Sequence, residues 1–421
     1  MKYAVVTFGC RVNQADSLGF EEDLLAAGAT AAPPETADLV VINTCSVTAT
    51  ADQGARQTIR RIARDNPAAR IVVTGCYATR RPAELSALPR VAEVVCNADK
   101  PRLLSIVSPL SLVAASSGGD GPCGAAVEPG VAGRTAYTLR VQTGCSEPCS
   151  YCIIPSTRGA PRSVPVDDVR RELERVMAAG FKEIALTGVH LGSYGRDSSP
   201  SSSLTELLQR IRLTTDSAGR SVLFRISSLE PMDCTRQIVD LVATSDCFAP
   251  HFHLPLQHAS DRVLADMRRP YTIEHYARLV DHVRERMPEA AIGTDVIVGF
   301  PGETDEDFDV LARYLERSPL THVHVFPYSD RPGTVATTFG GRASGGVIRE
   351  RARHVRDIGS RLARRFRDAQ VGTTHRALTL EDGSLVVTGN YLKLRIPPGL
   401  PRNEWVRVRI TSHDHGELLA G

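Results

Sequence analysis

The chain has 421 residues, of which 42% are hydrophobic and 23% are charged, and its formal net charge is +2. This composition is typical of a folded protein with roughly two to four domains and excludes a largely disordered chain. No apolar run approaches the ~18 residues that a membrane span needs. The apolar N-terminal run turns polar without a small-residue cleavage site, so we expect a cytoplasmic protein with no signal peptide and no membrane partner.

The first 107 residues alternate short β-branched runs with segments of helical spacing. This alternation predicts a parallel α/β sheet, and we take residues 1–107 as one domain. Residues 108–134 are rich in Gly, Ser, Ala and Pro, which predicts a linker. Strands are predicted at 3–8, 38–43, 70–74 and, more weakly, 91–96, with helices at 17–28 and 50–65.

Three cysteines of this domain occupy equivalent positions. Cys10, Cys45 and Cys76 each follow a predicted strand by one or two residues. Neighbouring parallel strands lie about 4.8 Å apart, so the three thiols should meet at one edge of the sheet, where open α/β sheets bind ligands. Single cysteines are common core residues. Three at matching strand ends favour a metal cluster.

A second alternating series, taken as a domain over residues 135–369, predicts a partial barrel. Six βα units are too few for an eight-stranded barrel, and a partial one should carry its site at the carboxyl ends of the strands. Its predicted strands are 137–143, 183–189, 222–228, 251–256, 292–300 and 322–328, and helices are predicted at 166–180 and 304–318.

The stretch GCSEPCSYC places Cys145, Cys149 and Cys152 just after the first barrel strand. Structural zinc takes four ligands, so zinc requires a distant histidine as the fourth and stays an alternative. An iron–sulfur cluster on three thiolates keeps one iron open for a substrate. The remaining cysteines lack such spacing: Cys96, Cys234 and Cys247 are interpreted as structural, and Cys123 as an unattached thiol in the linker.

The end of the chain predicts a small β-domain after an arginine-rich helix. Arginines crowd residues 341–370, as either a solvated helix face or a surface for an anionic partner. Residues 370–421 contain predicted strands at 374–381, 384–390, 391–397 and 404–412, typical of an oligonucleotide-binding-type barrel.

At this point the chain resembles the methylthiotransferases of the radical S-adenosylmethionine (SAM) superfamily. The C-x3-C-x2-C motif after the first strand of a partial barrel is similar to the cysteine motif of that superfamily. Three further cysteines in an N-terminal α/β domain and a C-terminal β-domain narrow the resemblance to the methylthiotransferases. The resemblance covers almost the whole chain. Its segments are FGCRVNQADS, INTCSVT, VTGCYA, GCSEPCSYCIIPSTRG, LTGVHLGSYG, HFHLPLQHASDRVL, MRRPYT, GTDVIVGFPGETDEDF and HVFPYSDRPGT.

The resemblance implies two [4Fe-4S] clusters, a radical SAM cluster on the barrel cysteines and an auxiliary cluster on the N-terminal cysteines. SAM would be both the radical source, cleaved by one electron, and the methyl donor to a sulfide on the auxiliary cluster. The CH3–S group would then pass to a carbon radical of the substrate. An electron donor of flavodoxin or ferredoxin type is implied. The SAM contacts that the resemblance implies are Tyr151, Thr187, Gly188, His190, Glu230 and Gln257, for which turn or packing roles are the alternatives.

The resemblance also implies a tRNA substrate. GCRVNQADS resembles the branch that acts on N6-threonylcarbamoyladenosine at tRNA position 37 (the MtaB type), adding the methylthio group at C2. The isopentenyladenosine branch tends toward GCQMN and the ribosomal-protein aspartate branch toward GCPKN; both stay alternatives, as does a non-catalytic, metal-stabilised RNA-binding protein. The C-terminal domain resembles the RNA-binding TRAM module. Candidate RNA contacts are Arg158, Arg162, Lys393, Arg395, Arg407 and Arg409, with a solvated surface as the alternative.

Overall fold

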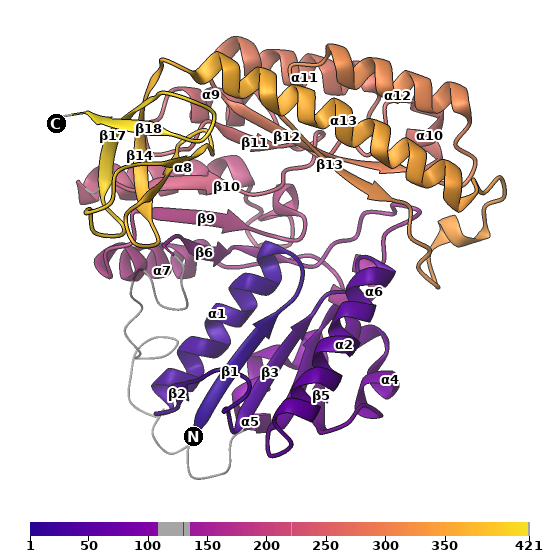
Figure 1. Cartoon of the computed structure of the whole chain (residues 1–421), viewed down its shortest axis with the longest axis vertical. Coiled ribbons are helices and arrows are strands. Elements are labelled where there is room, and N and C mark those ends of the chain that lie inside the picture. The colour runs from indigo at the N-terminus through magenta and orange to yellow at the C-terminus, as the bar shows by residue number, and fades with distance from the viewer. Residues whose placement is uncertain (108–128, 130–134, 220, 420–421) are drawn as a thin grey trace.

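The computed structural model describes residues 1–107, 129, 135–219 and 221–419 (Figure 1). The predicted linker over 108–134 therefore lies outside the described residues except for residue 129, and so does Cys123. The N-terminal sheet lies below the barrel in Figure 1, and the C-terminal sheet packs beside the barrel. No helix of the described residues is both long and apolar enough to cross a membrane.

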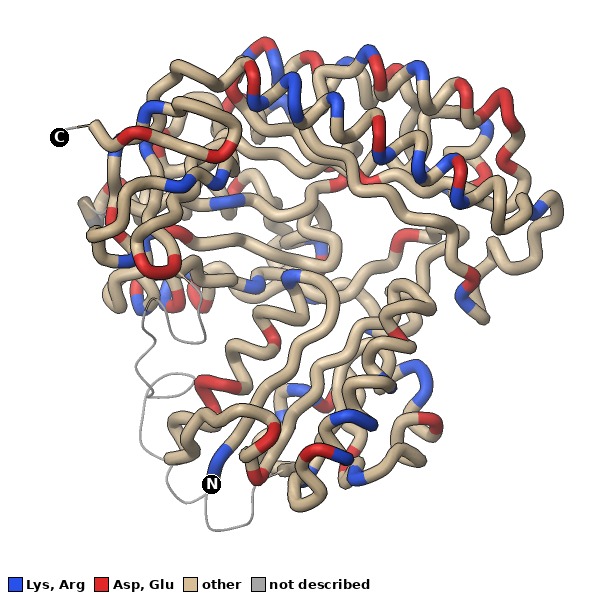
Figure 2. Tube along the Cα trace, viewed as in Figure 1, with Lys and Arg blue, Asp and Glu red and all other residues tan. Residues whose placement is uncertain are grey.

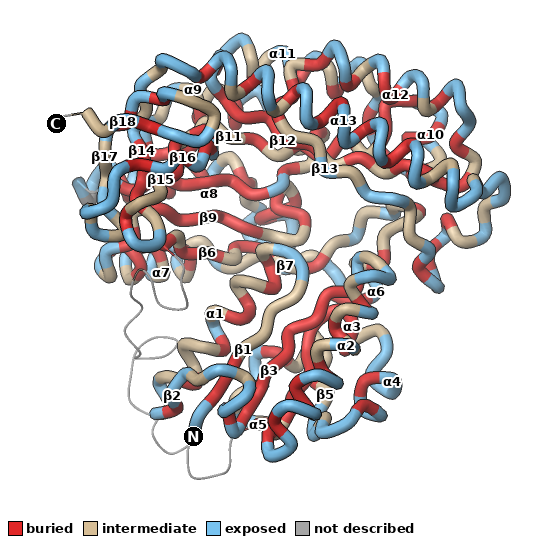
Figure 3. The backbone as a smooth tube through the Cα atoms, viewed as in Figure 1, coloured by how far each residue is buried: buried red, intermediate tan, exposed pale blue. Residues whose placement is uncertain are grey.

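The N-terminal sheet has five parallel strands in the order β2-β1-β3-β4-β5. Strand β3 is buried along its whole length, as Figure 3 shows, and β4 is buried except at its first residue. Val40 and Ile42 belong to the core beneath one face, whereas Leu39 and Val41 belong to the core beneath the other. The strands are β1 Lys2–Thr7, β2 Thr30–Ala31, β3 Leu39–Thr44, β4 Arg70–Gly75 and β5 Val91–Val95.

Helices cover both faces of this sheet. The longest, α2, packs Ile59 and Ile62 on one face, and α1 packs Phe20 and Leu24 on the other. The predicted helix at 17–28 begins six residues earlier than expected, directly after Cys10. The helices are α1 Arg11–Ala26, α2 Ala49–Asp65, α3 Cys76–Arg80, α4 Pro82–Ser86, the 3-10 helix η1 Asn97–Arg102 and α5 Leu103–Val107.

Six parallel strands form the partial barrel that the sequence predicts. They make two three-stranded sheets, β6-β9-β10 and β11-β12-β13, which a bridge between Phe224 and Phe248 connects. One hydrophobic core runs beneath all six. The strands are β6 Tyr137–Arg140, β9 Glu183–Thr187, β10 Leu223–Ile226, β11 His251–His253, β12 Ala291–Val298 and β13 His322–Pro327.

The helices of the barrel follow the strands. A short antiparallel pair, β7 Gln142–Thr143 and β8 Arg162–Ser163, closes the loop after β6. The helices are α6 Ile154–Arg158, α7 Val166–Ala178, η4 Leu191–Ser193, α8 Leu204–Ala218, α9 Arg236–Ala243, α10 Asp261–Asp266, α11 Ile273–Arg286, α12 Asp305–Arg317 and η5 Val335–Thr338.

The C-terminal part begins with α13, Gly345–Gln370, whose exposed face alternates basic and acidic residues (Figure 2). Five antiparallel strands follow in the order β16-β15-β14-β17-β18, and their core includes Phe366 of α13 and Ala291 of the barrel. The fifth strand was not predicted. The strands are β14 Thr374–Leu380, β15 Leu385–Thr388, β16 Lys393–Arg395, β17 Trp405–Ile410 and β18 Gly416–Leu419.

Candidate active site

Cys10, Cys45 and Cys76, here called the sheet trio, come together at one edge of the N-terminal sheet. Cys10 is the N-cap residue of α1, Cys45 follows β3, and Cys76 begins α3. Burial, and also the Cys10 and Cys76 thiolates nearby, raise the pKa of the Cys45 thiol to about 11. The three cysteines thus follow the carboxyl ends of the neighbouring strands β1, β3 and β4, which is the arrangement that the sequence predicts.

Glycines in left-handed conformations make this approach possible. Gly9 has φ +94°, and a Cβ on it would lie 2.5 Å from Cβ and 2.7 Å from Sγ of Cys45. Gly75, before Cys76, has φ +101°, and its Cβ would lie 2.2 Å from the Thr44 carbonyl oxygen. Only glycine adopts such a positive φ easily and also leaves room for atoms this close to its Cα. The backbone thus turns sharply into Cys10 and Cys76, and the thiol of Cys45 fills the space beside Gly9.

Cys145, Cys149 and Cys152, here called the barrel trio, lie in the loop between β7 and α6. Burial first, and then the other two thiolates, raise the pKa of Cys152 to about 12. The guanidinium of Arg269 donates to Cys149 Sγ at 3.3 Å and to the carboxylate of Glu230. The sequence did not lead us to predict a role for Arg269. Its place within the MRRPYT segment, which resembles the family, was the signal that could have identified it.

Both trios have the donor chemistry of an iron–sulfur site. All the cysteines that the structure describes are free thiols. Burial and mutual repulsion oppose ionisation of clustered thiols, whereas bound iron supplies the positive charge that deprotonates them. Each trio offers three thiolates, so a four-iron cluster on it would keep one iron for another ligand.

His190, after β9, lies against the barrel trio. Its Nδ1 is 3.8 Å from Cys145 Sγ, and its Nε2 is 2.7 Å from a carboxylate oxygen of Asp233. Although burial lowers it, hydrogen bonds to Asp233 and Cys145 raise the pKa of His190 to about 10. Asp233 was missed from the sequence, because it lies far along the chain from both partners. The pair places a cationic imidazole beside Cys145.

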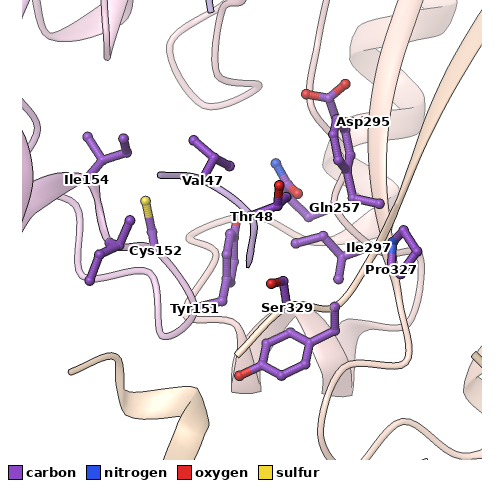
Figure 4. Close-up of a pocket in the computed structure, with 13 residues that line it drawn as sticks. Val47, Thr48, Tyr151, Cys152, Ile154, Gln257, Asp295, Ile297, Pro327 and Ser329 are labelled. Atoms are coloured by element: carbon purple, nitrogen blue, oxygen red, sulfur yellow. The ribbon is translucent and has the colours of Figure 1, made fainter. Parts of the chain in front are cut away.

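A cavity of about 180 Å³ lies beside the barrel trio, with Cys152 in its wall (Figure 4). The N-terminal domain contributes Val47 and Thr48, which follow Cys45 by two and three residues. The barrel loop contributes Tyr151 and Cys152. Gln257, Asp295, Ile297 and residues 326–329 complete the wall from the barrel strands. The cavity therefore has walls from both cysteine-bearing parts of the chain.

The expected SAM contacts group around the barrel trio. Tyr151 and Gln257 line the cavity, while His190 and Glu230 reach the trio through the contacts above. The other two lie where β9 ends: Thr187 is buried, with its carbonyl accepting from Val141 N–H at 2.9 Å, and the Gly188 backbone packs against Gln142.

Three further side chains on neighbouring strands face one another, and one of them, Asp295, lines the cavity. His253 Nε2 is 3.1 Å from Asp295 Oδ1, and ligand atoms of His253, Asp295 and His324 all lie within 4.8 Å of one another. Such a set has the composition of a divalent-cation site and equally offers hydrogen bonds to a substrate.

The helix that follows the barrel trio contacts the sheet trio directly. Arg158, on α6, was expected at a substrate phosphate, but its side chain is buried, and it pairs with Asp16 and donates to Asn13. A buried guanidinium that already has a carboxylate partner cannot reach solvent RNA, so that expectation is wrong. Asn97 adds a second link, donating to Thr157 O at 2.8 Å and lying 3.7 Å from Cys76 Sγ.

Asp16 is the centre of this junction between the two parts. It accepts from Lys100 at 2.6 Å, from Arg158 at 3.2 Å and from Arg140. Burial opposes ionisation, but these three cations lower the pKa of Asp16 from 3.8 to about 2. The ionised form therefore stabilises the fold above about pH 4, and that contribution, about 2 kcal/mol, is lost as the pH falls toward 2.

Asp16→Asn is expected to lower the free energy of unfolding by about 3–5 kcal/mol near neutral pH, because it leaves three cations around a neutral amide. Chemical denaturation followed by circular dichroism measures the change. Glu84→Gln is the matched control: it removes a carboxylate from the exposed pair with Arg56 and should cost less than about 1 kcal/mol. Equal, small losses in both variants would contradict this account of the junction.

The other candidate RNA contacts are exposed. Arg162 lies on the strand after α6, and Lys393 and Arg395 lie on β16 with Leu394 buried between them. Arg407 and Arg409 are likewise exposed on β17, which β14 and β15 separate from β16. The two pairs thus lie on different strands of one sheet.

Comparison with known proteins agrees with this geometry. Residues 2–97 match a family described as Uncharacterized protein family UPF0004, and residues 139–315 match the Radical SAM superfamily. A protein of Aquifex aeolicus named threonylcarbamoyladenosine tRNA methylthiotransferase MtaB is 36% identical over 94% of this chain and 96% of its own. A Bacillus subtilis protein of the same name is 36% identical over 86% of this chain and 80% of its own.

A solved structure shares the fold. The radical SAM methyltransferase TsrM from Kitasatospora setae matches 80% of this chain and 76% of its own, with a TM-score of 0.57 at 17% identity. The likeness in fold, the two matched families and the extent of the MtaB similarity all agree with the two cysteine trios. The chain belongs to the radical SAM methylthiotransferase family.

Proposed function

We propose that this protein attaches a methylthio group to C2 of N6-threonylcarbamoyladenosine at position 37 of tRNA. The observation that carries the proposal is a cavity with walls from the sheet-trio domain and from the barrel-trio loop. A donor site and an activating site on one cavity allow a sulfur group to reach an activated carbon without passing through solvent. The substrate follows from the names of relatives that are 36% identical over most of the chain.

The barrel trio would hold a [4Fe-4S] cluster that binds SAM, and the sheet trio would hold an auxiliary [4Fe-4S] cluster. When bound, these groups supply the electron, the hydrogen abstraction, and the sulfur and methyl groups that the reaction needs. Cys145, Cys149 and Cys152 would fix the first site in the barrel mouth. Cys10, Cys45 and Cys76 would fix the second at the facing sheet edge.

The side chains around the barrel trio would orient SAM and balance charge. Arg269 holds Glu230 and donates to Cys149, so it offsets the negative charge of the thiolates and fixes a carboxylate beside them. His190, held by Asp233, does the same beside Cys145. Tyr151 and Gln257 line the cavity, where a bound adenine or ribose would contact them. Thr187 and Gly188 would present backbone groups at the end of β9.

The three predicted domains would divide the work. Residues 1–107 present the sheet trio, residues 135–369 present the barrel trio, and residues 370–421 form an RNA-binding surface. Arg162, Lys393, Arg395, Arg407 and Arg409 would contact phosphates of the tRNA, whose binding should then weaken with salt. A small electron-transfer protein of flavodoxin or ferredoxin type would supply electrons, and the reaction would take place in the cytoplasm, where tRNA is available.

Nucleoside analysis of tRNA tests the substrate. Cells that lack this protein are expected to lose 2-methylthio-N6-threonylcarbamoyladenosine and to accumulate the unmodified N6-threonylcarbamoyladenosine, as measured by mass spectrometry of digested tRNA. Re-expression should restore the modified base. Loss of the methylthiolated isopentenyl nucleoside, with the threonylcarbamoyl nucleoside unchanged, would contradict the proposal.

A further inference from the structure

Arg11 lies where the three parts of the chain meet. It is the first residue of α1, directly after Cys10 of the sheet trio. Its Nη2 donates to the phenol oxygen of Tyr391, on the turn between β15 and β16, at 3.3 Å. The Tyr391 ring is 5.0 Å from the ring of His251 on β11, and the Arg225 guanidinium lies 4.7 Å from its centroid. The N-terminal sheet, the barrel and the C-terminal sheet therefore each contribute to this junction.

Arg11 differs from the buried arginines in its partners. Each fully buried arginine pairs with an acidic side chain; these are Arg158, Arg225, Arg269, Arg331 and Arg351. Arg11 is half-buried, yet within the part of the chain that the structure describes no Asp or Glu lies within ion-pair distance of it. No acidic residue occupies the first turn of α1 either. Its guanidinium has donors to spare for an anion.

Histidines line the nearby wall of the barrel, and Asp295, the carboxylate among them, pairs with His253. His251 and His253 on β11 alternate with Phe252, and His322 and His324 repeat the pattern on β13. Burial, followed by the charges of Arg225 and Arg11, holds the pKa of His251 well below its usual range, so this histidine is neutral beside Arg11. Arg225 is already neutralised by Glu183. Among the described residues, Arg11 is thus a positive charge at this junction that has no acidic partner.

The side chains on β11 connect to the cavity through the neighbouring strand β12. His253 bonds Asp295, and Asp295 lines the cavity beside the barrel trio. In adenine C2 and C6 both flank N1, so a base whose C2 lies in that cavity carries its N6 substituent on the same edge of its six-membered ring, beside the cavity. In threonylcarbamoyladenosine the threonine is attached through its nitrogen, so its carboxylate is free and ionised at neutral pH. A dimethylallyl substituent carries no charge.

We propose that Arg11 binds the free carboxylate of the threonylcarbamoyl group and thereby selects this base over uncharged N6-substituted adenosines. The inference rests on the proposed function. A guanidinium fits a carboxylate with two parallel hydrogen bonds, which gives both affinity and orientation. Tyr391 holds the guanidinium from the C-terminal sheet, so the sheet that would contact RNA also positions the group that reads the base.

The test compares two anticodon stem-loop RNAs, one with threonylcarbamoyladenosine and one with its methyl ester, which removes the charge. With the reconstituted full-length protein, kcat/KM for methylthiolation is expected to be roughly ten- to hundredfold higher for the acid than for the ester. Arg11→Gln should reduce kcat/KM for the acid by about that factor, leave the ester within about twofold, and so abolish the preference. Arg11→Lys should retain part of it.

Two controls separate this role from a structural one. Arg60→Gln removes an exposed arginine on the outer face of α2 and should keep the preference of the unaltered protein. Arg11→Gln should keep its iron content and its substrate-independent SAM cleavage. An unaltered protein that treats acid and ester alike, or an Arg11→Gln variant that slows both equally, would overturn the inference. Failure of the unaltered protein to modify the acid at all would instead overturn the proposed function.

Discussion

Replacing the barrel trio with alanine is expected to abolish reductive SAM cleavage, whereas replacing the sheet trio should leave that cleavage and abolish only methylthio transfer. Each trio would hold its own cluster, because no cysteine belongs to both trios. Asn97 connects the two sites through its contacts with Thr157 of α6 and with Cys76. Each triple variant should therefore lose about four of about eight irons. Iron and sulfide analysis after anaerobic reconstitution, with chromatography of 5′-deoxyadenosine, measures both effects.

Cys234→Ala is the matched control for these variants. Cys234 is buried in the hydrophobic core of the barrel and belongs to neither trio, so its loss should cost stability but no iron. Two results would contradict the assignment. One is zinc without acid-labile sulfide in the purified protein. The other is SAM cleavage that survives loss of the barrel trio.

Gly9→Ala is expected to damage the sheet trio selectively. The added Cβ would lie 2.5 Å from Cys45 Cβ and 2.7 Å from Cys45 Sγ, so Cys45 or the Cys10 turn must move. The residue would also keep φ near +94°, which costs an alanine about 1 kcal/mol. We expect loss of about four irons and at least a tenfold loss of methylthiolation, with SAM cleavage retained. Iron content and product analysis measure these separately.

Gly28→Ala separates the clash from the backbone strain. Gly28 also has a positive φ, +79°, but a Cβ there meets no atom within 4 Å. This variant should lose about 1 kcal/mol of stability and keep all its iron. If Gly9→Ala and Gly28→Ala bound equal amounts of iron, the close approach of Gly9 to Cys45 would have no part in building the site.

Strand ends were the most reliable guide from the sequence. Each cysteine of the sheet trio follows a β-branched run, and parallel strands of similar length necessarily bring their carboxyl ends together. The start of α1 was missed for a physical reason. Its first turns bury Val12 but otherwise the polar residues Asn13, Asp16 and Ser17, so the signal from hydrophobic periodicity is weak there.

The supporting side chains could not be predicted in the same way. Arg269 contacts Cys149 across 120 residues of the chain, and Asp233 contacts His190 across 43 residues. No local sequence pattern encodes such contacts. Arg158 shows the opposite error. An arginine after the cysteine loop was expected to face solvent, but its side chain is buried and pairs with Asp16. Charge alone does not reveal which surface a residue faces.

The most direct test is a single anaerobic reaction of the reconstituted protein with SAM, a reductant, a sulfide source and a stem-loop RNA containing threonylcarbamoyladenosine. The account predicts that the base gains one methylthio group at C2 and that 5′-deoxyadenosine is formed in the same reaction. Formation of 5′-deoxyadenosine with no methylthiolated base, or methylthiolation of an isopentenyladenosine stem-loop instead, would contradict it.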